Sequence, residues 1–279
     1  AVIIKDGKIA FVGTTADAKA RIGTSVEVID LKGKMLMPGV QDSHMHPLEA
    51  GSEAVSCILT AEQAISSQLD TIADCIDHDT TGSDWILGFG HSLHALLEES
   101  TTRTPRAILD ELIPDRPIAI MEETSHSVWV NSKALALAGI KADTVNPEGG
   151  VILKDKSGQP NGILLDAAGD LVFELAFAPT PELKKANYQG LLAGLKQVAE
   201  HGITSMVDAR LYWKRGTLEA YDQVLKEGKL TARTNISVWA YPGGVTDDEQ
   251  IAKIKSLYRN DANSLLRLNQ IKFYSDGIL

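Results

Sequence analysis

Basic residues are in short supply in this sequence. It carries 27 lysines and arginines against 37 aspartates and glutamates, which gives a net charge of −10. Nucleic-acid binding needs Lys and Arg clustered to meet the phosphates, and no basic stripe is present. We therefore expect no nucleic-acid partner. The charge says little about a substrate, because net charge reports on solubility more than on a site.

Cysteines and long apolar runs are also scarce. The two cysteines, Cys57 and Cys75, are too few for a disulfide framework or a cysteine-type zinc site. They favour a reducing compartment, and we expect a cytoplasmic location. No window reaches the length of a transmembrane helix, so no membrane partner is expected. No signal peptide is visible, although the chain begins at Ala1 inside an expected strand and a targeting segment can be missing from it.

Two further signatures are absent. No Gly-x-Gly-x-x-Gly follows an expected strand, so a flavin or nicotinamide enzyme has no support. No low-complexity segment or solenoid repeat occurs either. The chain of 279 residues is long enough for one large domain or two smaller ones.

The second half of the chain alternates helix and strand. An amphipathic helix at 181–201 ends at Gly202. After it we expect strands at 203–208, 233–240 and 271–274, with helices at 218–225 and 247–258. This alternation is typical of βα units around a parallel sheet. With a strand near residue 40 it gives roughly four barrel-type strands, whereas a closed barrel needs eight.

The first half is more mixed. Residues 2–12 predict a hairpin around Asp6-Gly7, and alternating residues predict short strands at 26–31 and 34–37. Further along, we expect helices at 62–77, from 104 and at 131–138, strands at 84–89 and 117–121, and a polar hairpin within 146–162.

One short segment carries the strongest chemical signal. His44 and His46 stand two residues apart in an expected strand, where residues i and i+2 share a face. Two imidazoles on one rigid strand can bind one metal ion. The pair alone does not decide between a metal site and a chance pattern. The small sheet, the Pro38-Gly39 breaker and the neighbouring Asp42 favour a metal site.

Longer segments resemble a known family. MPGVQDSHMHPLEAG at 37–51 is similar to the metal-binding segment that opens the barrel in the amidohydrolase superfamily. The segments SHSVWVNS, GQPNGILLD, GITSMVDA and IKFYSDGIL resemble its family 3 branch, which contains N-substituted formamide deformylases. The resemblance covers nearly the whole chain in order.

The resemblance implies a fold and its domains. We expect an α/β protein that forms part of a (β/α)8 TIM barrel of the metal-dependent hydrolase type. Residues 1–38 would be part of a small β-sandwich domain. Residues 39–279 would form the first part of the barrel, with an inserted α/β segment at about 50–165.

The resemblance also implies metal ligands. His44 and His46 would bind one or two divalent metal ions, expected to be Zn²⁺, and Lys272 would be carboxylated and bridge them. A buried lysine with a lowered pKa can react as the neutral amine with carbon dioxide. The residues by themselves favour a lysine in an apolar strand whose ammonium group reaches solvent.

Two catalytic candidates follow from the same resemblance. His126 would line the active site and polarise a substrate carbonyl or hold the oxyanion; alternatively it is a loop histidine packed on Trp129. Asp208 would bind substrate or support a metal ligand; alternatively it is a helix N-cap.

Other polar residues have weaker cases. Asp42 is expected to be structural or to support a ligand, and not to bind the metal itself. Asp166 stands where the family branch often has glutamate, which puts a substrate role in doubt. His91, His94 and Glu98 fall at helical spacing and are expected to form a solvated helix face.

The implied function is hydrolysis of an amide or formamide-type C–N bond in a small molecule by metal-activated water. The family places further ligands and an aspartate base in segments that this sequence does not contain. We therefore expect the chain alone to be catalytically incomplete, with a second chain or a C-terminal half completing the barrel. A homo-oligomer is a further expectation. The alternative is a non-catalytic remnant or structural subunit that binds a partner through an open sheet edge.

Overall fold

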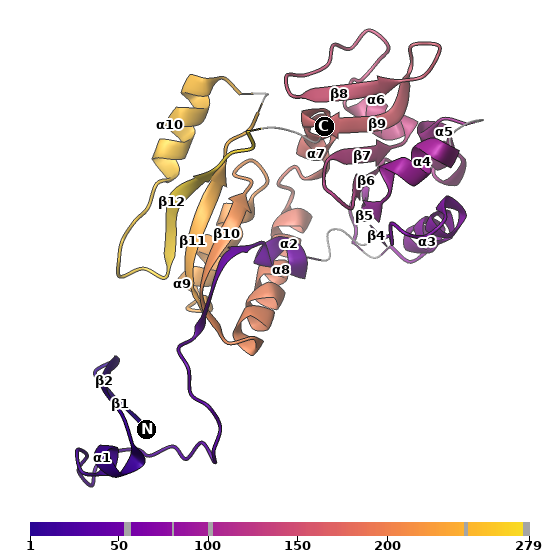
Figure 1. Ribbon diagram of the computed structural model, residues 1–279. Helices are drawn as coiled ribbons and strands as arrows, with labels where there is room; N and C mark the ends of the chain where they lie inside the picture. Colours follow the sequence, from indigo (N-terminus) through magenta and orange to yellow (C-terminus); the bar gives the residue numbers. More distant parts are fainter. Residues whose placement is uncertain (53–56, 80, 100–102, 243–244, 276–279) are drawn as a thin grey trace. The chain divides into compact units, whose positions relative to one another are not determined.

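The computed structural model describes all residues except 53–56, 80, 100–102, 243–244 and 276–279. The chain divides into two compact units, Ala1–Pro38 and Gly39–Leu279. In Figure 1 the first unit is drawn in indigo, and the second runs from violet to yellow. None of the described helices is long and apolar enough to cross a membrane.

The first unit contains a hairpin and one short helix. Strands β1 (Val2–Lys5) and β2 (Lys8–Val12) pair in antiparallel fashion, and α1 spans Thr15–Lys19. Asp6 and Gly7 both adopt positive φ, 51° and 71°, as the tight hairpin turn requires. The predicted hairpin is confirmed. The strands predicted at 26–31 and 34–37 are wrong, because these residues lie in loops. The β-sandwich assignment stays a prediction.

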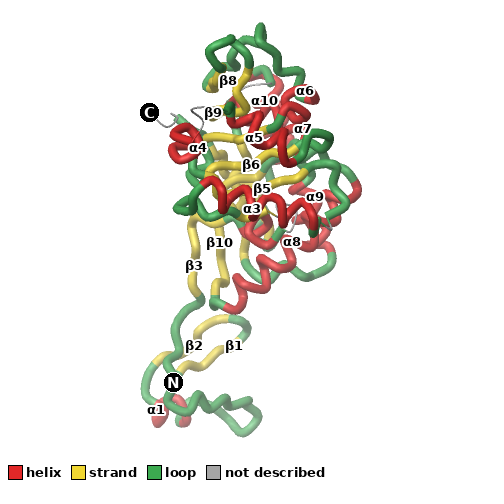
Figure 2. Tube along the Cα trace, turned by 90° about the vertical axis from the view of Figure 1, so that its right-hand side faces the viewer, coloured by secondary structure: helices red, strands yellow, loops and turns green. Residues whose placement is uncertain are grey.

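The second unit contains a sheet of four parallel strands. These are β3 (Val40–Met45), β10 (Ile203–Leu211), β11 (Arg233–Trp239) and β12 (Leu266–Lys272), in the order β12-β11-β10-β3. Figure 2 shows β3 beside β10, although about 160 residues separate them along the chain. The expectation of four parallel strands is confirmed for the described residues, whereas their place in a barrel stays a prediction. The closed eight-stranded barrel stays a prediction.

Four helices accompany this sheet: α2 (Pro47–Gly51), α8 (Pro181–Glu200), α9 (Thr217–Lys226) and α10 (Asp247–Leu257). Apolar side chains of the strands and helices form one buried cluster, which includes Leu195, Met206, Tyr221, Ile236 and Leu268. Burial of such side chains stabilises the fold by about 1.5–3 kcal/mol each. The core therefore fixes the strands whose ends carry the candidate site.

A second sheet lies between β3 and α8 in the sequence. It has six strands in the order β4-β5-β6-β7-β9-β8. Its strands are β4 (Cys57–Ile58), β5 (Ile86–His91), β6 (Ile118–Glu122), β7 (Ser127–Val130), β8 (Gly150–Lys154) and β9 (Pro160–Asp166). The pairs β4-β5 and β5-β6 are parallel, and the other pairs are antiparallel.

Helices α3 (Ile65–Asp77), α4 (Leu93–Glu99), α5 (Pro105–Leu112), α6 (Ser132–Leu137) and α7 (Ala167–Ala176) belong to this part of the chain. Two apolar clusters form, one with α3 and α5 and the other with α6 and α7. The predicted hairpin within 146–162 is confirmed as β8 and β9. The strand β7 and the helix α7 were not predicted.

One histidine of this sheet contradicts the sequence interpretation. His91 is not on a solvated helix face but is fully buried in β5. Its ring packs against Trp129, with ring centres 6.0 Å apart. Burial lowers the pKa of His91 to about 4, so the ring is neutral near pH 7. His94 and Glu98 do form an exposed pair on α4, 3.3 Å apart, as expected.

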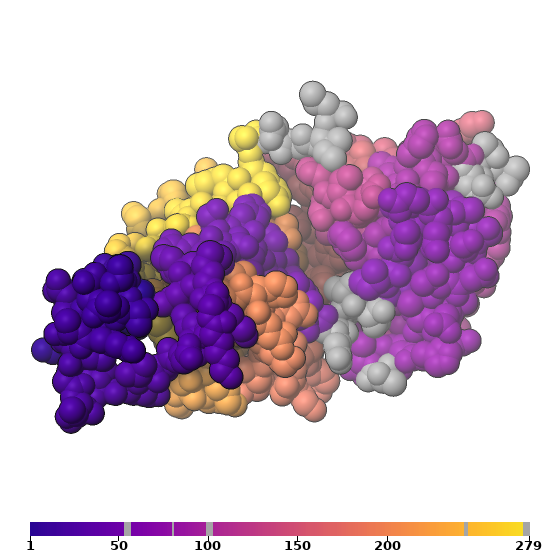
Figure 3. Space-filling model, turned by 60° about the horizontal axis from the view of Figure 1, so that its bottom comes forward, coloured from indigo at the N-terminus to yellow at the C-terminus, as the bar shows by residue number. Residues whose placement is uncertain are grey.

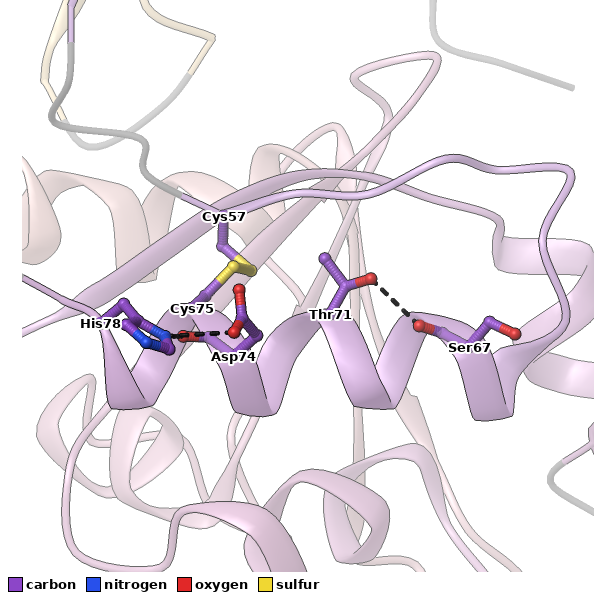
Figure 4. Close-up of a disulfide and its surroundings, with 6 residues drawn as sticks. All are labelled: Cys57, Ser67, Thr71, Asp74, Cys75 and His78. Atoms are coloured by element: carbon purple, nitrogen blue, oxygen red, sulfur yellow. Dashed lines mark hydrogen bonds and ion pairs between the residues drawn. A yellow bond between two sulfur atoms is a disulfide. The ribbon is translucent and has the colours of Figure 1, made fainter.

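The two cysteines form a disulfide. Cys57 in β4 is bonded to Cys75 in α3, and Figure 4 shows the bond joining the helix to the strand segment above it. The sulfur of Cys57 is buried within the cluster that includes Ile72 and Ile86. Disulfides persist in oxidising compartments and are rare in the cytosol. The bond therefore removes the basis on which a reducing compartment was inferred.

Candidate functional site

Polar and aromatic residues gather at the carboxyl ends of the four parallel strands. His44 lies near the end of β3 and His46 directly follows this strand, so only His44 lies in the strand expected to carry both histidines. Asp208 and Arg210 lie near the end of β10, and Lys272 ends β12. In barrels of parallel strands, active sites lie at this end. The strand topology thus brings residues far apart in the sequence to one rim.

His44 and His46 lie close together. Their ring centres are 5.4 Å apart with the ring planes nearly perpendicular. Two imidazoles that each bind one cation through a nitrogen at about 2.1 Å have ring centres roughly 5 Å apart, so the pair fits a shared divalent ion. The backbone N–H of His44 donates to Asp42 Oδ1 at 2.9 Å. Asp42 therefore has the structural role that was expected.

His46 faces carboxylates. Its Nδ1 lies 3.5 Å from Asp208 Oδ1 and 4.0 Å from Glu49 Oε2. The Nδ1 atom is buried and forms no hydrogen bond within the described residues. The separation from Asp208 is therefore a close approach of nitrogen and oxygen and not a hydrogen bond of ordinary geometry.

Asp208 is almost fully buried and lies within strand β10, so its interpretation as a helix N-cap is wrong. Tyr221 of α9 donates its hydroxyl to Asp208 Oδ2 at 2.7 Å. Burial, and then the charge of Asp208, raise the pKa of Tyr221 well above its usual value. Tyr221 thus acts as a hydrogen-bond donor to this carboxylate.

Lys272 is half-buried and reaches an aromatic ring. Its Nζ lies 4.9 Å from the ring centre of Tyr274, whose hydroxyl accepts a hydrogen bond from Arg210 Nη1 at 2.9 Å. Arg210 Nη2 in turn lies 3.2 Å from Glu49 Oε2. This chain of contacts links Lys272 to the residues around His46. The structure does not bring three or more His, Cys, Asp or Glu side chains of the described residues together as a metal site.

His126 lies in the six-stranded sheet, directly before β7. Its Nδ1 is 2.7 Å from Asp166 Oδ1, and its carbonyl oxygen accepts the backbone N–H of Asp166. Ser125 and Asp166 both adopt positive φ, 65° and 47°. Non-glycine residues pay a steric cost in this region, which often marks functional positions. His126 is therefore paired with Asp166 and is not packed on Trp129, which His91 contacts instead.

Glycines hold the short helix α2 against α8. A Cβ on Gly194 would lie 2.0 Å from the carbonyl oxygen of Pro47, and a Cβ on Gly190 would lie 2.7 Å from Ser52 Cα. Figure 3 shows the violet residues of β3 and α2 against the orange residues that follow α8. Pro47 directly follows His46, so this close approach of backbones positions the end of β3.

Replacement of Gly194 by alanine is expected to lower the free energy of unfolding by about 2 kcal/mol, because overpacking outweighs the better helix propensity of alanine. It is also expected to weaken zinc binding, since α2 must shift beside His46. Chemical denaturation and zinc titration measure the two effects. Gln197→Ala, at an exposed position of the same helix, is the control. A Gly194→Ala protein that matches the wild type in both measurements would contradict the expectation.

Several residues of this site were not predicted. Glu49, Arg210 and Tyr221 carry the contacts of His46 and Asp208. Tyr221 stands on the apolar face of a helix, where its hydroxyl gives no sequence signal. Arg210 follows the predicted strand at 203–208 directly, and a longer strand would have placed it at the rim.

Solved structures share this fold. The chain aligns with an uncharacterized metal-dependent hydrolase from Pyrococcus horikoshii OT3 at a TM-score of 0.64 and 21% identity, over 97% of this chain and 49% of that chain. A metal-dependent hydrolase from Pyrococcus furiosus aligns at a TM-score of 0.61 and 19% identity, over 97% and 51%. This chain therefore shares its fold with about half of each of these two structures.

Sequence comparison gives the family. Residues 27–279 match the profile of the Amidohydrolase family. YtcJ of Bacillus subtilis is 30% identical over 287 aligned residues, which cover 100% of this chain and 51% of that protein. The N-substituted formamide deformylase of Arthrobacter pascens is 30% identical over 234 residues, 82% and 42%. The chain belongs to the amidohydrolase family, in its family 3 branch, as the sequence resemblance predicted. It spans about half the length of the curated relatives it matches.

Proposed function

We propose that this chain carries the first metal-binding strand of a metal-dependent hydrolase that cleaves amide or formamide-type C–N bonds in a small molecule. The observation that carries the proposal is the pair His44 and His46, with ring centres 5.4 Å apart at the carboxyl end of β3. A buried carboxylate, Asp208, stands next to the second histidine.

The metal fits the donor groups of the site. His44 and His46 would hold one divalent ion, expected to be Zn²⁺, because imidazole nitrogen suits this metal. Lys272, in the carboxylated form, would supply anionic oxygens to one or two ions. A divalent ion bound there supplies Lewis acidity, which activates water and polarises a carbonyl group.

The chain's own residues supply orientation. Asp166 accepts from His126 Nδ1 at 2.7 Å, which leaves Nε2 as the nitrogen that can meet a substrate. In its protonated form this ring would donate to the carbonyl oxygen of the scissile bond and stabilise the oxyanion. Arg210 donates hydrogen bonds to Glu49 and to the Tyr274 hydroxyl. It thereby joins the segment that follows β3 to the segment that follows β12.

Metal content tests the proposal. The purified protein is expected to contain about one equivalent of zinc or more by elemental mass spectrometry, and His44→Ala/His46→Ala is expected to lose it. The matched control is His78→Ala/His94→Ala, which removes two exposed histidines paired with Asp74 and Glu98. A folded wild-type protein that binds no divalent metal would contradict the proposal and favour a non-catalytic subunit. Release of formate from N-substituted formamides by the metal-loaded protein would extend the proposal from metal binding to hydrolysis of a C–N bond.

A further inference from the structure

Tyr221 and Asp208 form a buried polar pair inside an apolar core. Tyr221 is fully buried on α9 in the cluster that includes Leu195, Val224 and Ile236. A tyrosine hydroxyl in such surroundings needs a partner, and its partner is Asp208 Oδ2 at 2.7 Å. A buried carboxylate needs donors just as much. The hydroxyl therefore fixes the direction in which the carboxylate points.

The second oxygen of Asp208 faces a metal-ligand candidate. Asp208 Oδ1 accepts the backbone N–H of Arg210 at 3.3 Å and lies 3.5 Å from His46 Nδ1. That nitrogen is buried and otherwise unpartnered among the described residues. Glu49 lies farther from it, at 4.0 Å, and is paired with Arg210. Asp208 is thus the nearer acceptor for a proton on Nδ1.

A proton on Nδ1 decides which nitrogen of His46 can bind a cation. Metal-binding histidines commonly give their other ring N–H to a carboxylate, which fixes both the tautomer and the ring orientation. With Nδ1–H directed at Asp208, the lone pair of His46 is on Nε2. His44 differs, because its ring is exposed and its contact with Asp42 is made through the backbone N–H.

We propose that Tyr221 and Asp208 are positioning residues that hold His46 as the Nδ1–H tautomer and present its Nε2 to the metal ion. The proposal rests on the proposed function in one respect, namely that His46 is a metal ligand. The two contacts on which it depends, the hydrogen bond from Tyr221 to Asp208 Oδ2 and the approach of Asp208 Oδ1 to His46 Nδ1 at 3.5 Å, come from this structure alone. Of the two roles expected for Asp208 from the sequence, contact with substrate and support of a metal ligand, the proposal selects the second.

Two isosteric variants test the proposal. Asp208→Asn keeps the shape but offers an amide N–H toward the ring, and Tyr221→Phe removes only the hydroxyl. Zinc affinity, measured by calorimetric titration with Zn²⁺ alone, is expected to fall about tenfold to a hundredfold in Asp208→Asn and by a smaller factor in Tyr221→Phe. Tyr188→Phe is the matched control, because its hydroxyl bonds to Glu227 and Lys229 at the surface.

A second measurement separates this proposal from the proposed function. Long-range ¹H–¹⁵N NMR of histidine-labelled, metal-free protein reports the tautomer of His46. The wild type is expected to show Nδ1–H, and Asp208→Asn is expected to shift the population toward Nε2–H. Those results uphold the positioning role even if the protein binds no zinc. The proposal is overturned if the folded Asp208→Asn and Tyr221→Phe proteins bind zinc as the wild type does, or if the His46 tautomer is the same in all of them.

Discussion

Replacement of Arg215 by methionine is expected to lower the free energy of unfolding by about 3 kcal/mol, the lower end of the cost of breaking a buried ion pair, because the two carboxylates that lose this partner are half-buried. Arg215 follows β10 and is almost fully buried. Its guanidinium contacts Glu174 Oε1 at 3.2 Å and Asp170 Oδ1 at 3.5 Å, both on α7. Its centre lies 3.7 Å from the ring centre of Tyr212. The variant removes the buried cation and leaves two half-buried carboxylates, of which Glu174 keeps Lys214 Nζ at 3.9 Å.

Chemical denaturation measures this loss. The matched control is Arg259→Met, which breaks an ion pair with Asp222 at a half-exposed position and is expected to cost about 1 kcal/mol or less. Adding Asp170→Asn and Glu174→Gln to Arg215→Met is expected to restore part of the stability, because the uncompensated charges are then gone. An Arg215→Met loss as small as that of Arg259→Met would show that the cluster contributes no more than a surface pair.

Reduction of the disulfide is expected to lower the free energy of unfolding by about 3 kcal/mol, since the bond closes a loop of similar length to those for which the chain-entropy model gives that value. Cys57 and Cys75 are 18 residues apart. Opening the bond frees α3 from β4 only in the unfolded ensemble, so the folded unit is expected to keep its secondary structure. Denaturation curves with and without reductant measure the difference.

The double variant Cys57→Ala/Cys75→Ala serves as the control for reductant effects. Its denaturation curve is expected to be the same with and without reductant, and to lie near that of the reduced wild type. A wild-type curve that reductant does not move, together with two titratable thiols in the unfolded protein, would show that the bond is not formed in solution.

Much of the fold follows from local patterns. The helix at 181–201 was predicted because an apolar stripe and a terminal Gly202 agree, and α8 spans Pro181–Glu200. The strand predicted at 271–274 is displaced, since β12 spans Leu266–Lys272 and its buried residues are Leu266 and Leu268. Arg267 separates these two leucines and the polar residues Asn269 and Gln270 follow them, so the segment contains no apolar run that would have predicted the strand.

Prediction of strands from the sequence fails where the presence of a neighbouring strand determines whether a segment forms a strand. Residues 26–31 alternate as a strand does, yet Val28 and Ile29 are 71% and 74% exposed and form no ladder in the described structure. A strand needs a neighbour for its backbone groups, and alternation alone does not supply one. Strand β7 shows the converse, because four consecutive buried residues give no alternation although β6 and β9 pair with it.

The candidate site also contains residues that the sequence predicts and residues that only the packing brings together. His44 and His46 are two residues apart, so their common face could be read from the sequence, and the structure brings their rings together. The partners Tyr221 and Asp208 are joined to His46 only through the packing of α9 and β10 on β3. No local pattern encodes a contact between residues that are more than 150 positions apart. The ligand roles of His44, His46 and Lys272 stay proposals until metal is measured.

The backbone of Asp166, at φ 47° and ψ −126°, also bears on protein engineering. Glycine adopts such angles without the roughly 1–3 kcal/mol that other residues spend there. Variants selected only for heat resistance would therefore drift toward glycine at position 166 and release His126 from its carboxylate. A thermostability screen of this protein would reward loss of the very group that orients the histidine, so position 166 has to be held constant in any such library.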